Sequence, residues 1–401
     1  MRTPPRTLQT LTDRFDGELL QPRARRARVR LALRDGDAWD AVLEERAATL
    51  VPAKGEADAT LTADARTWAR IAADIRGGMD AYRSGRLAVR HNLHLGVGFL
   101  AATSDQRGRG RVRFSAVRTR RGRLSTLEAG SGPALVAIHG LGATKGSFLP
   151  TVAALGERMR VIAVDLPGFG DSDKPLGASY DARFFARAIV GLLDALELER
   201  AHLIGNSLGG RVALEVALAH PERVRRLALL CPSLAWRRQR PWAPVVRLMQ
   251  PKLGLVQVAP RPFVEALVHR MIPGAEHGWT AAGVDEFLRA YLTPSGRAAF
   301  YAAARHIYLE EPHGDEGFWT RLRDLRADAL FVWGKRDRLV PIAFARHVAE
   351  ALPHARQLEL DCGHVPQVER PRQTHDAVAD FLLERAARRE KVAASRQGQA
   401  A

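Results

Sequence analysis

Apolar and polar positions follow one rhythm in the first hundred residues of this chain and another in the rest. Arg28–Leu33 alternates apolar and charged residues, Asp35-Gly36 is a turn pair, and Ala38–Leu43 resumes the strand pattern. This pattern predicts a β-hairpin. Further elements are expected in this order: a strand over 58–62, a helix that Thr62 or Asp64 caps and Gly77-Gly78 ends, a strand over 86–90, and an apolar helix over 92–102. Together they predict a small α+β unit.

A polar, glycine-rich stretch over 104–111 separates this unit from a part with short apolar runs between helical stretches. Such alternation predicts a mostly parallel sheet with both faces covered by helices, an α/β fold. The apolar runs are 135–138, 161–164, 202–204, 227–230, 330–333 and 358–360, and residues 113–117 and 124–128 are expected to add antiparallel strands.

One gap of about 100 residues, between Leu230 and Leu330, interrupts this rhythm. Helical patterns at 262–272, 284–292 and 297–309 fill it, so a helical cap inserted at one edge of the sheet is expected. The predicted organisation is an α+β domain over 1–103, a linker over 104–112, an α/β core over 113–233 and 327–390, the cap over 234–326 and a flexible tail over 391–401.

Charge and cysteine usage limit the partners and the compartment. Lys and Arg number 61 against 44 Asp and Glu, a net charge of +17 over 401 residues. The arginines are scattered and no aromatic residues alternate with them, so nucleic acid is not expected and solvated basic faces are favoured, with an anionic lipid surface as the alternative. Cys231 and Cys362 fit no disulfide or metal spacing, and no secretory or membrane-spanning run is present. We expect a cytoplasmic protein without cofactor or metal; its oligomeric state has no signature here.

The pentapeptide Gly205-Asn206-Ser207-Leu208-Gly209 follows the apolar run Ala201–Ile204 and opens a helical stretch. A strand, a sharp turn with serine at its tip and a helix N-terminus expose the hydroxyl beside backbone N–H donors. The pattern predicts that Ser207 is a nucleophile. Because such pentapeptides are common, the prediction depends on partner residues elsewhere in the chain.

Three partners are expected at the carboxyl ends of other strands, where sites in such sheets lie. The loop 139–142 after the strand 135–138 can turn the amide of Leu141 towards the serine, beside the amide of Leu208, as an oxyanion hole. His139 is expected to hold this loop by hydrogen bonds. Asp337 follows the strand 330–333 and His364 follows the last strand, in the order serine, acid, base.

Competing residues are less well placed for these two roles. Among the carboxylates, Asp324 and Asp328 precede the strand, and Asp361 is too close to the histidine. Among the histidines, His347, His354 and His375 lie on expected helices or at their edges.

With these residues in view, the chain from about 113 to 385 resembles the α/β-hydrolase superfamily, which residues 165–172 and Gly209-Gly210 also match. The resemblance implies Ser207 as nucleophile, His364 as base, Asp337 as orienting acid, and the amides of Leu141 and Leu208 as the oxyanion hole. Substrate contacts are expected from these residues: His139, Gly140, Asn206 and Trp236. A serine nucleophile argues against the dehalogenase and epoxide hydrolase branches. Hydrolysis of a carboxylic ester is expected, in the manner of a carboxylesterase or lipase.

Two alternatives stay open. Asn206 before the serine is also found in carbon–carbon bond hydrolases of ring-cleavage products, although Val365 follows the histidine where that branch usually has an aromatic residue. The other alternative is a lipid carrier whose hydrolase half only binds.

The first unit, over about 25–102, resembles the sterol-carrier-protein family in residues 58–64, 67–72 and 84–92, with His91 where glycine is usual. That resemblance implies an apolar tunnel for lipid, and the substrate is therefore expected to be an apolar or lipid-like ester. A tunnel collapsed into a plain core, used for docking or dimerisation, is the alternative.

Overall fold

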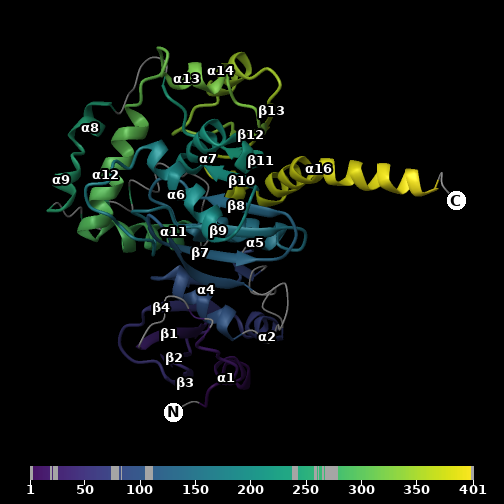
Figure 1. Cartoon of the computed structure of the whole chain (residues 1–401). Coiled ribbons are helices and arrows are strands. Elements are labelled where there is room, and N and C mark those ends of the chain that lie inside the picture. The colour runs from purple at the N-terminus through teal and green to yellow at the C-terminus, as the bar shows by residue number, and fades with distance from the viewer. Residues whose placement is uncertain are drawn as a thin grey trace.

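A computed structural model describes most of the chain, and Figure 1 shows two sheets, with the smaller one near the N-terminus. The described residues are 3–18, 20, 26–73, 81–82, 84–103, 112–236, 243–256, 260, 262–263, 266 and 279–398, with side chains to residue 384 but not at 279–281. The expected linker over 104–112 lies outside them except for Val112. The expected end of the second helix at Gly77-Gly78 and most of the expected helix over 262–272 also lie outside them.

The N-terminal unit is a five-stranded sheet in the order β3-β2-β1-β4-β5, in which only the β1–β4 pair is parallel. Its elements are α1 (Arg6–Asp13), β1 (Arg26–Leu33), β2 (Ala38–Glu44), β3 (Ala47–Pro52), β4 (Ala59–Ala63), α2 (Ala65–Ala73), β5 (Ala88–Arg90) and α4 (Leu93–Ala102). The hairpin, the later strands and both helices match the expectation, whereas α1 and β3 were not anticipated.

Local capping explains two of these boundaries. The carboxylate of Asp64 accepts the N–H of Thr67 at 2.7 Å, and the side-chain oxygen of Asn92 accepts the N–H of Leu95 at 2.9 Å, so each begins a helix. His91 adopts a φ of 70°, a left-handed conformation that favours glycine. The turn before α4 therefore keeps the geometry expected for a glycine at this position.

The large sheet has eight strands in the order β13-β12-β11-β10-β8-β9-β7-β6, parallel from β9 to β13 and antiparallel at β7 and β6. Its strands are β6 (Arg113–Thr119), β7 (Gly122–Ala129), β8 (Ala134–Ile138), β9 (Arg160–Val164), β10 (Ala201–Asn206), β11 (Val224–Leu230), β12 (Asp328–Gly334) and β13 (Arg356–Leu360). The main helices beside it are α5 (Leu149–Leu155), α6 (Ala182–Ala195), α7 (Leu208–Ala219), α14 (Phe344–Ala351), α15 (Pro366–Glu369) and α16 (Pro371–Gly398). All eight expected strands are confirmed.

Alternate side chains of each central strand enter two different cores. Leu135 and Ala137 of β8 pack into the core that contains α5, α16 and the N-terminal unit. Val136 and Ile138 pack into the core that contains α6, α7 and α14. Both faces of the sheet are thus covered, as near-continuous apolar strands require.

The cap contains α8 (Ala243–Leu248), α9 (Pro251–Gly254), α11 (Trp279–Tyr291), α12 (Pro294–Tyr308) and α13 (Phe318–Leu322). The helices expected over 284–292 and 297–309 correspond to α11 and α12. At the other end of the chain, the tail expected over 391–401 is helical as far as Gly398, because its Ala, Arg and Lys residues favour a helix. Figure 1 shows α16 projecting from the core.

The N-terminal unit is attached to the cap through two carboxylates of α11. Asp285 accepts the N–H of His91 at 2.7 Å and pairs with the guanidinium of Arg90 at 2.7 Å. Glu286 accepts the N–H of Leu93 at 2.7 Å. Because both carboxylates are almost fully buried, these charge-assisted bonds fix α11 against the turn between β5 and α4.

A buried ionic cluster joins the N-terminal unit, the hydrolase core and the cap. The ammonium of Lys145 lies 2.6 Å from Asp165, 3.1 Å from Asp171 and 2.7 Å from Nδ1 of His94. Arg289 of α11 pairs with Asp171 at 2.7 Å. Burial opposes ionisation of Asp171, but His94, Lys145 and Arg289 outweigh it and hold the pKa of this carboxyl far below its usual value.

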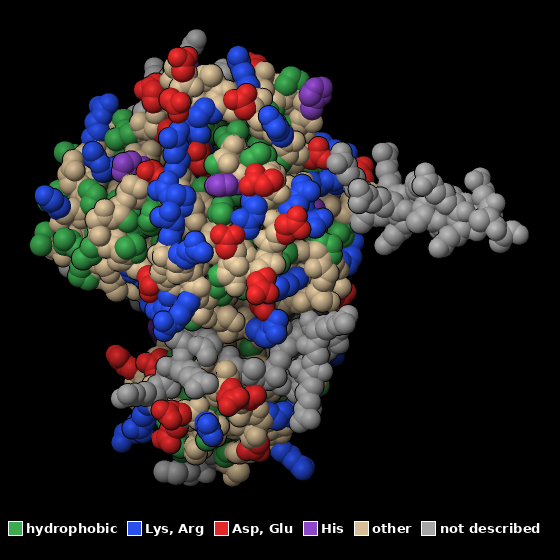
Figure 2. All heavy atoms as spheres, viewed as in Figure 1, with side chains coloured by type: hydrophobic (Ala, Val, Ile, Leu, Met, Phe, Trp, Pro, Cys, Tyr) green, Lys and Arg blue, Asp and Glu red, His purple; other side chains and the backbone are tan. Residues whose placement is uncertain are grey.

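The surface carries mixed charge on the face shown in Figure 2, where Lys and Arg side chains are interspersed with Asp and Glu. This distribution fits the scattered arginines of the sequence. No helix in the described part of the chain is long and apolar enough to cross a membrane.

Candidate active site

Ser207 occupies a strained turn between β10 and α7. Its φ of 54° and ψ of −117° lie in a region that non-glycine residues rarely adopt, so tertiary contacts must hold the turn. Its N–H donates to the carbonyl of Leu230 at 3.0 Å, and its carbonyl accepts the N–H of Ser233 at 2.9 Å. A Cβ at Gly209 would lie 1.9 Å from the carbonyl oxygen of Ile138, so only glycine allows α7 this close to β8.

Asp337 and His364 form a buried hydrogen-bonded pair. Nδ1 of His364 lies 2.7 Å from one carboxylate oxygen of Asp337, and the other oxygen accepts the N–H groups of Leu339 and Val340 at 2.8 and 3.0 Å. Burial favours the neutral acid, but the neighbouring His364 and these two donors outweigh it and hold the pKa of Asp337 below its usual value. The carboxylate therefore accepts from Nδ1–H, so that Nε2 is the ring nitrogen left to exchange a proton with a reacting group.

Asn206 joins the serine turn to the histidine loop. Its side-chain amide donates to the carbonyl of Leu230 at 3.0 Å and to the carbonyl of His364 at 2.9 Å. The residue that precedes Ser207 thus holds the backbone of His364 at the same end of the sheet. Asn206 was predicted to contact substrate, and the structure uses its NH₂ group for this internal bridge.

The loop after β8 passes beside the serine, as predicted for an oxyanion hole. A Cβ at Gly140 would lie 3.3 Å from Cβ of Ser207, so the backbone before Leu141 is close to the predicted nucleophile. Leu208 is the first residue of α7, and the first N–H groups of a helix have no acceptor within it. The two predicted oxyanion donors therefore belong to segments that meet at Ser207.

His139 holds this loop by hydrogen bonds at both of its ring nitrogens. Its Nε2 accepts the N–H of Leu166 at 2.9 Å, which leaves Nδ1 protonated towards the carbonyl of Gly140 at 2.7 Å. Burial lowers the pKa of His139 although Asp165 opposes the effect. A neutral ring with both nitrogens engaged agrees with the expected loop-holding role and leaves no nitrogen for the substrate contact that was also predicted.

Two aromatic residues of the cap lie against Gly142 of the loop predicted to form the oxyanion hole. A Cβ at Gly142, where φ is +75°, would come within 2.7 Å of Phe287 and 3.1 Å of Phe300. Both rings pack on an apolar cluster of the cap formed by Val284, Leu288, Tyr291 and Tyr301. Trp236, also predicted to contact substrate, instead packs edge-on against Phe344 and beside Tyr308. Phe287 and Phe300 are thus the cap residues in contact with this loop at Gly142.

Cys231 is a neighbour of the pair that the sequence did not reveal. Its Sγ, a carboxylate oxygen of Asp337 and a ring nitrogen of His364 all lie within 4.8 Å of one another. Burial, reinforced by Asp337, raises the pKa of the Cys231 thiol well above its usual value. Because a metal ligand must be the thiolate, this environment disfavours a metal site, and Cys231 acts as a packing residue.

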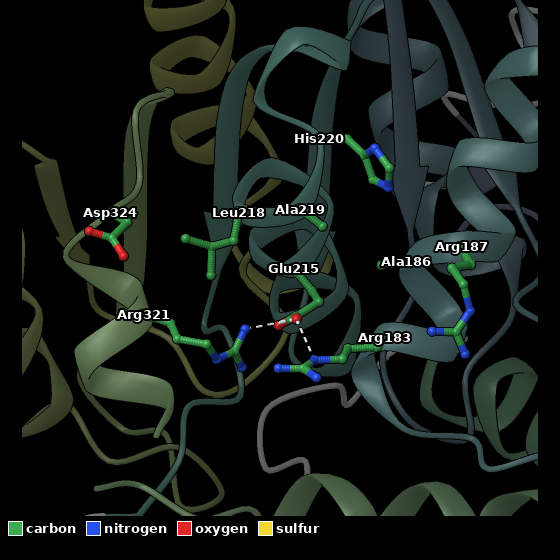
Figure 3. A pocket seen from close by; sticks show the side chains of 9 residues that line it. All are labelled: Arg183, Ala186, Arg187, Glu215, Leu218, Ala219, His220, Arg321 and Asp324. Carbon is green, nitrogen blue, oxygen red and sulfur yellow. Dashed lines mark hydrogen bonds and ion pairs between the residues drawn. The ribbon is translucent and has the colours of Figure 1, made fainter. Parts of the chain in front are cut away.

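A cavity of ≈ 410 Å³ lies at the opposite end of α7 from Ser207, between α6, α7 and α13 (Figure 3). Its lining residues are Arg183, Ala186, Arg187, Glu215, Leu218, Ala219, His220, Arg321 and Asp324. Glu215 pairs with Arg321 at 2.8 Å and with Arg183 at 3.5 Å, so the charges at its centre are compensated. The cavity shares no residue with the serine site.

Comparisons with known proteins identify the family of the fold. The alpha/beta hydrolase fold family matches residues 133–371. The 2-hydroxymuconate semialdehyde hydrolase of Pseudomonas sp. (strain CF600) is 30% identical over 273 residues, 64% of this chain and 89% of that protein. The pimeloyl-[acyl-carrier protein] methyl ester esterase of Aeromonas hydrophila subsp. hydrophila is 31% identical over 261 residues, 63% of this chain and 96% of that protein.

Among solved structures, one described as a membrane phospholipase A, a bacterial virulence factor, aligns with a TM-score of 0.57 and 29% identity over 68% of this chain and 86% of its own. The family match begins after the N-terminal unit and includes Ser207, Asp337 and His364. The protein is a hydrolase, and its chain belongs to the α/β-hydrolase family.

Proposed function

We propose that the enzyme hydrolyses a carboxylic ester with an apolar, lipid-like portion through an acyl-enzyme on Ser207. The observation that carries this proposal is the strained serine turn, which Asn206 bridges to the His364–Asp337 pair, beside a loop whose Gly142 lies against aromatic residues of the cap. A serine turn and a histidine–carboxylate pair joined by one asparagine, with an apolar wall beside them, support these residues as nucleophile, base and orienting acid.

The mechanism follows from the roles these groups can take. Nε2 of His364 removes the proton of the Ser207 hydroxyl as its oxygen attacks the ester carbonyl. The N–H groups of Leu141 and Leu208 stabilise the oxyanion, and His364 then protonates the leaving alcohol. Water activated by His364 hydrolyses the acyl-enzyme. The ionised Asp337 stabilises the imidazolium in both steps.

Charge pairing near the cap favours a neutral substrate. Arg211, on the first turn of α7, is fully buried and binds Glu215 and Glu310, and Arg289 of α11 binds Asp171 and Glu286. Both guanidinium groups are therefore compensated by two carboxylates each. An anionic substrate would find neither of them available, whereas an apolar chain can pack against the rings that cover the loop.

Carbon–carbon bond hydrolysis of a ring-cleavage product is the second candidate. The relative from Pseudomonas sp. is named for such a substrate, 2-hydroxymuconate semialdehyde. The relative from Aeromonas hydrophila is named for a methyl ester, so the relatives support either chemistry. The compensated arginines favour the ester, because the ring-cleavage product carries a carboxylate.

Lipid binding by the N-terminal unit is a further part of the proposal. The α+β architecture of the unit and its apolar helix α4 support this role. The burial of α4 along nearly its whole length, between the small sheet and the hydrolase core, favours docking instead. Native mass spectrometry of the full-length chain after incubation with fatty acid or sterol tests this role. Uptake of one lipid molecule by both the wild type and Ser207→Ala would support this role. No uptake of fatty acid or of sterol would contradict it and leave docking as the function of the unit.

The first test of the catalytic proposal is the substitution Ser207→Ala. Removing the nucleophile should lower kcat for an ester such as p-nitrophenyl octanoate by at least about 10⁴-fold and abolish labelling by a fluorophosphonate probe. Circular dichroism should show an unchanged fold. Equal labelling of both proteins, or of neither, would contradict the assignment of the serine.

A substrate panel separates the two chemistries. We expect kcat/KM to rise from acetyl to octanoyl esters, because each buried methylene contributes about 0.8 kcal/mol, and turnover of 2-hydroxymuconate semialdehyde to be weak. Faster turnover of the semialdehyde than of any ester would identify carbon–carbon bond hydrolysis as the activity. A preference for the acetyl ester would remove the lipid-like substrate.

A further inference from the structure

Exposed apolar side chains are concentrated on the cap. Among the described residues the cap carries these large exposed hydrophobic side chains: Val245, Leu248, Leu253, Leu255, Val256, Phe263 and Leu292, whereas only Leu176 is comparable elsewhere. Leu248 and Val256 are 73% and 78% exposed. Exposed apolar side chains gathered in one part of a folded protein indicate a surface for association.

The helices α8 and α9 expose most of their large apolar side chains to solvent. Their buried residues are few and mostly small: Ala243 and Val246 of α8, and Gly254 of α9. Two arginines of α12 hold their backbone: Arg297 donates to the carbonyl of Gly254 at 2.8 Å, and Arg305 donates to the carbonyl of Val246 at 3.4 Å. This arrangement is the reverse of an ordinary surface helix, which buries its apolar stripe and exposes polar residues.

Basic residues accompany this apolar surface, and acidic ones do not. Arg247 and Lys252 are exposed on the same two helices. No Asp or Glu occurs in the sequence between Glu222 and Glu265. In Figure 2, hydrophobic side chains with Lys and Arg beside them gather at the edge where Figure 1 places α8 and α9. The face therefore combines exposed aliphatic groups with positive charge.

We propose that this α8–α9 face, defined by Val245, Arg247, Leu248, Lys252, Leu253, Leu255 and Val256, docks on an anionic lipid bilayer. Aliphatic side chains can enter the headgroup region while the basic ones pair with anionic headgroups. A second copy of the chain would bring the same cations against Arg247 and Lys252, and nucleic acid would leave the aliphatic groups unsatisfied. An anionic bilayer satisfies both features.

The position of this face gives docking a consequence for the active site. α8 and α9 pack on α12, and α12 also contributes Phe300, which lies over the oxyanion loop. A bilayer on the outer side of α12 would therefore be one helix away from the aromatic wall. Docking itself does not depend on the ester chemistry, so its test uses no activity.

Flotation of the full-length protein with lipid vesicles tests the proposal. We expect binding to vesicles of equal parts phosphatidylglycerol and phosphatidylcholine, little binding to phosphatidylcholine alone, and loss of binding at high ionic strength. Leu248→Ser should weaken binding about tenfold, because its side chain no longer enters the bilayer. The matched control is Leu176→Ser, at a leucine 69% exposed outside the cap, which should bind as the wild type does.

A second pair of variants separates this face from the net charge. Arg247→Gln with Lys252→Gln should weaken binding about tenfold or more, and Arg118→Gln with Arg120→Gln, which removes the same charge from exposed positions of the β6–β7 hairpin, should not. Equal losses in both pairs would overturn the proposal in favour of diffuse attraction to the whole surface. No binding to any vesicle, with a dimer in sedimentation that Leu248→Ser dissociates, would overturn it in favour of a second copy.

Discussion

His202 is a buried histidine near the start of β10 whose Nδ1 has no hydrogen-bond partner among the described residues. Burial, with Arg225 and Arg226 nearby, lowers the pKa of His202 to about 4. The folded state therefore binds this proton less readily than the unfolded chain, where the value is about 6.5. The contribution of His202 to stability is complete above about pH 6.5 and is lost as the pH falls towards 4.

The substitution His202→Leu should remove this acid sensitivity. An apolar side chain fits the buried strand position and carries no proton, so about 3 kcal/mol of the stability that the wild type loses between pH 6.5 and pH 4 should be retained. Thermal denaturation at pH 7 and near pH 4 measures the effect. His354→Leu, at an exposed histidine, is the control. An equal fall in Tm for wild type and His202→Leu would contradict the argument.

The placement of candidate residues at strand ends could be predicted from the sequence. Ser207, Asp337 and His364 each follow an apolar run, and parallel strands bring such positions to one edge of the sheet. The ionic cluster of Lys145, Asp171 and His94 could not be predicted. His94 reaches Lys145 and Asp171 only because the N-terminal unit docks on the core, and no local pattern encodes that docking.

At the scale of elements, α11 connects the N-terminal unit with the active site. Asp285 and Glu286 hold it to the turn before α4, Arg289 holds it to Asp171, and Phe287 lies over Gly142 of the oxyanion loop. Because α11 is rigid, the contacts that fix it to the N-terminal unit also fix the position of Phe287 over the loop. The N-terminal unit therefore helps to place the aromatic wall of the proposed substrate site.

Replacing both carboxylates, Asp285→Asn with Glu286→Gln, should loosen this attachment. Weakened charge-assisted bonds should cost about 1–3 kcal/mol of stability, and a mobile Phe287 should reduce the preference for octanoyl over acetyl esters several-fold, mainly through KM. Ester kinetics and Tm measure both effects. Glu316→Gln breaks an exposed ion pair with Arg183 elsewhere in the cap and should change neither. A lower Tm with unchanged chain-length preference would show that the attachment is only structural.

Elements with a regular pattern were predicted, and irregular ones were missed for physical reasons. The core strands are buried on both faces and appear as continuous apolar runs. β3 is an edge strand that is exposed or half-buried along its length, so its sequence shows no alternation. α8 and α9 turn their apolar residues outwards, which is the opposite of the periodicity that predicts a surface helix.

At the scale of the whole molecule, the N-terminal unit and the hydrolase core share one hydrophobic core. Buried residues of the small sheet, such as Leu31 and Leu61, belong to the same cluster as Leu135 and Val332 of the large sheet. α4 lies between them, and Leu93 packs against Gly146 of the core. The sequence predicted two domains because the spacing of apolar positions changes near residue 104. This spacing indicates the type of each element, but it does not indicate whether two units pack together.

A shared core predicts that the two units unfold together. Phe99 of α4 is fully buried in the N-terminal unit, and Phe99→Ala should cost about 3–5 kcal/mol through the lost burial and the cavity left behind. If unfolding is cooperative, the loss of ellipticity and the loss of ester hydrolysis should shift together to a lower temperature, in one calorimetric transition. Two transitions, with hydrolysis surviving the first, would instead establish an independent N-terminal domain. Phe99→Ala would then unfold only the N-terminal unit and leave the serine site intact.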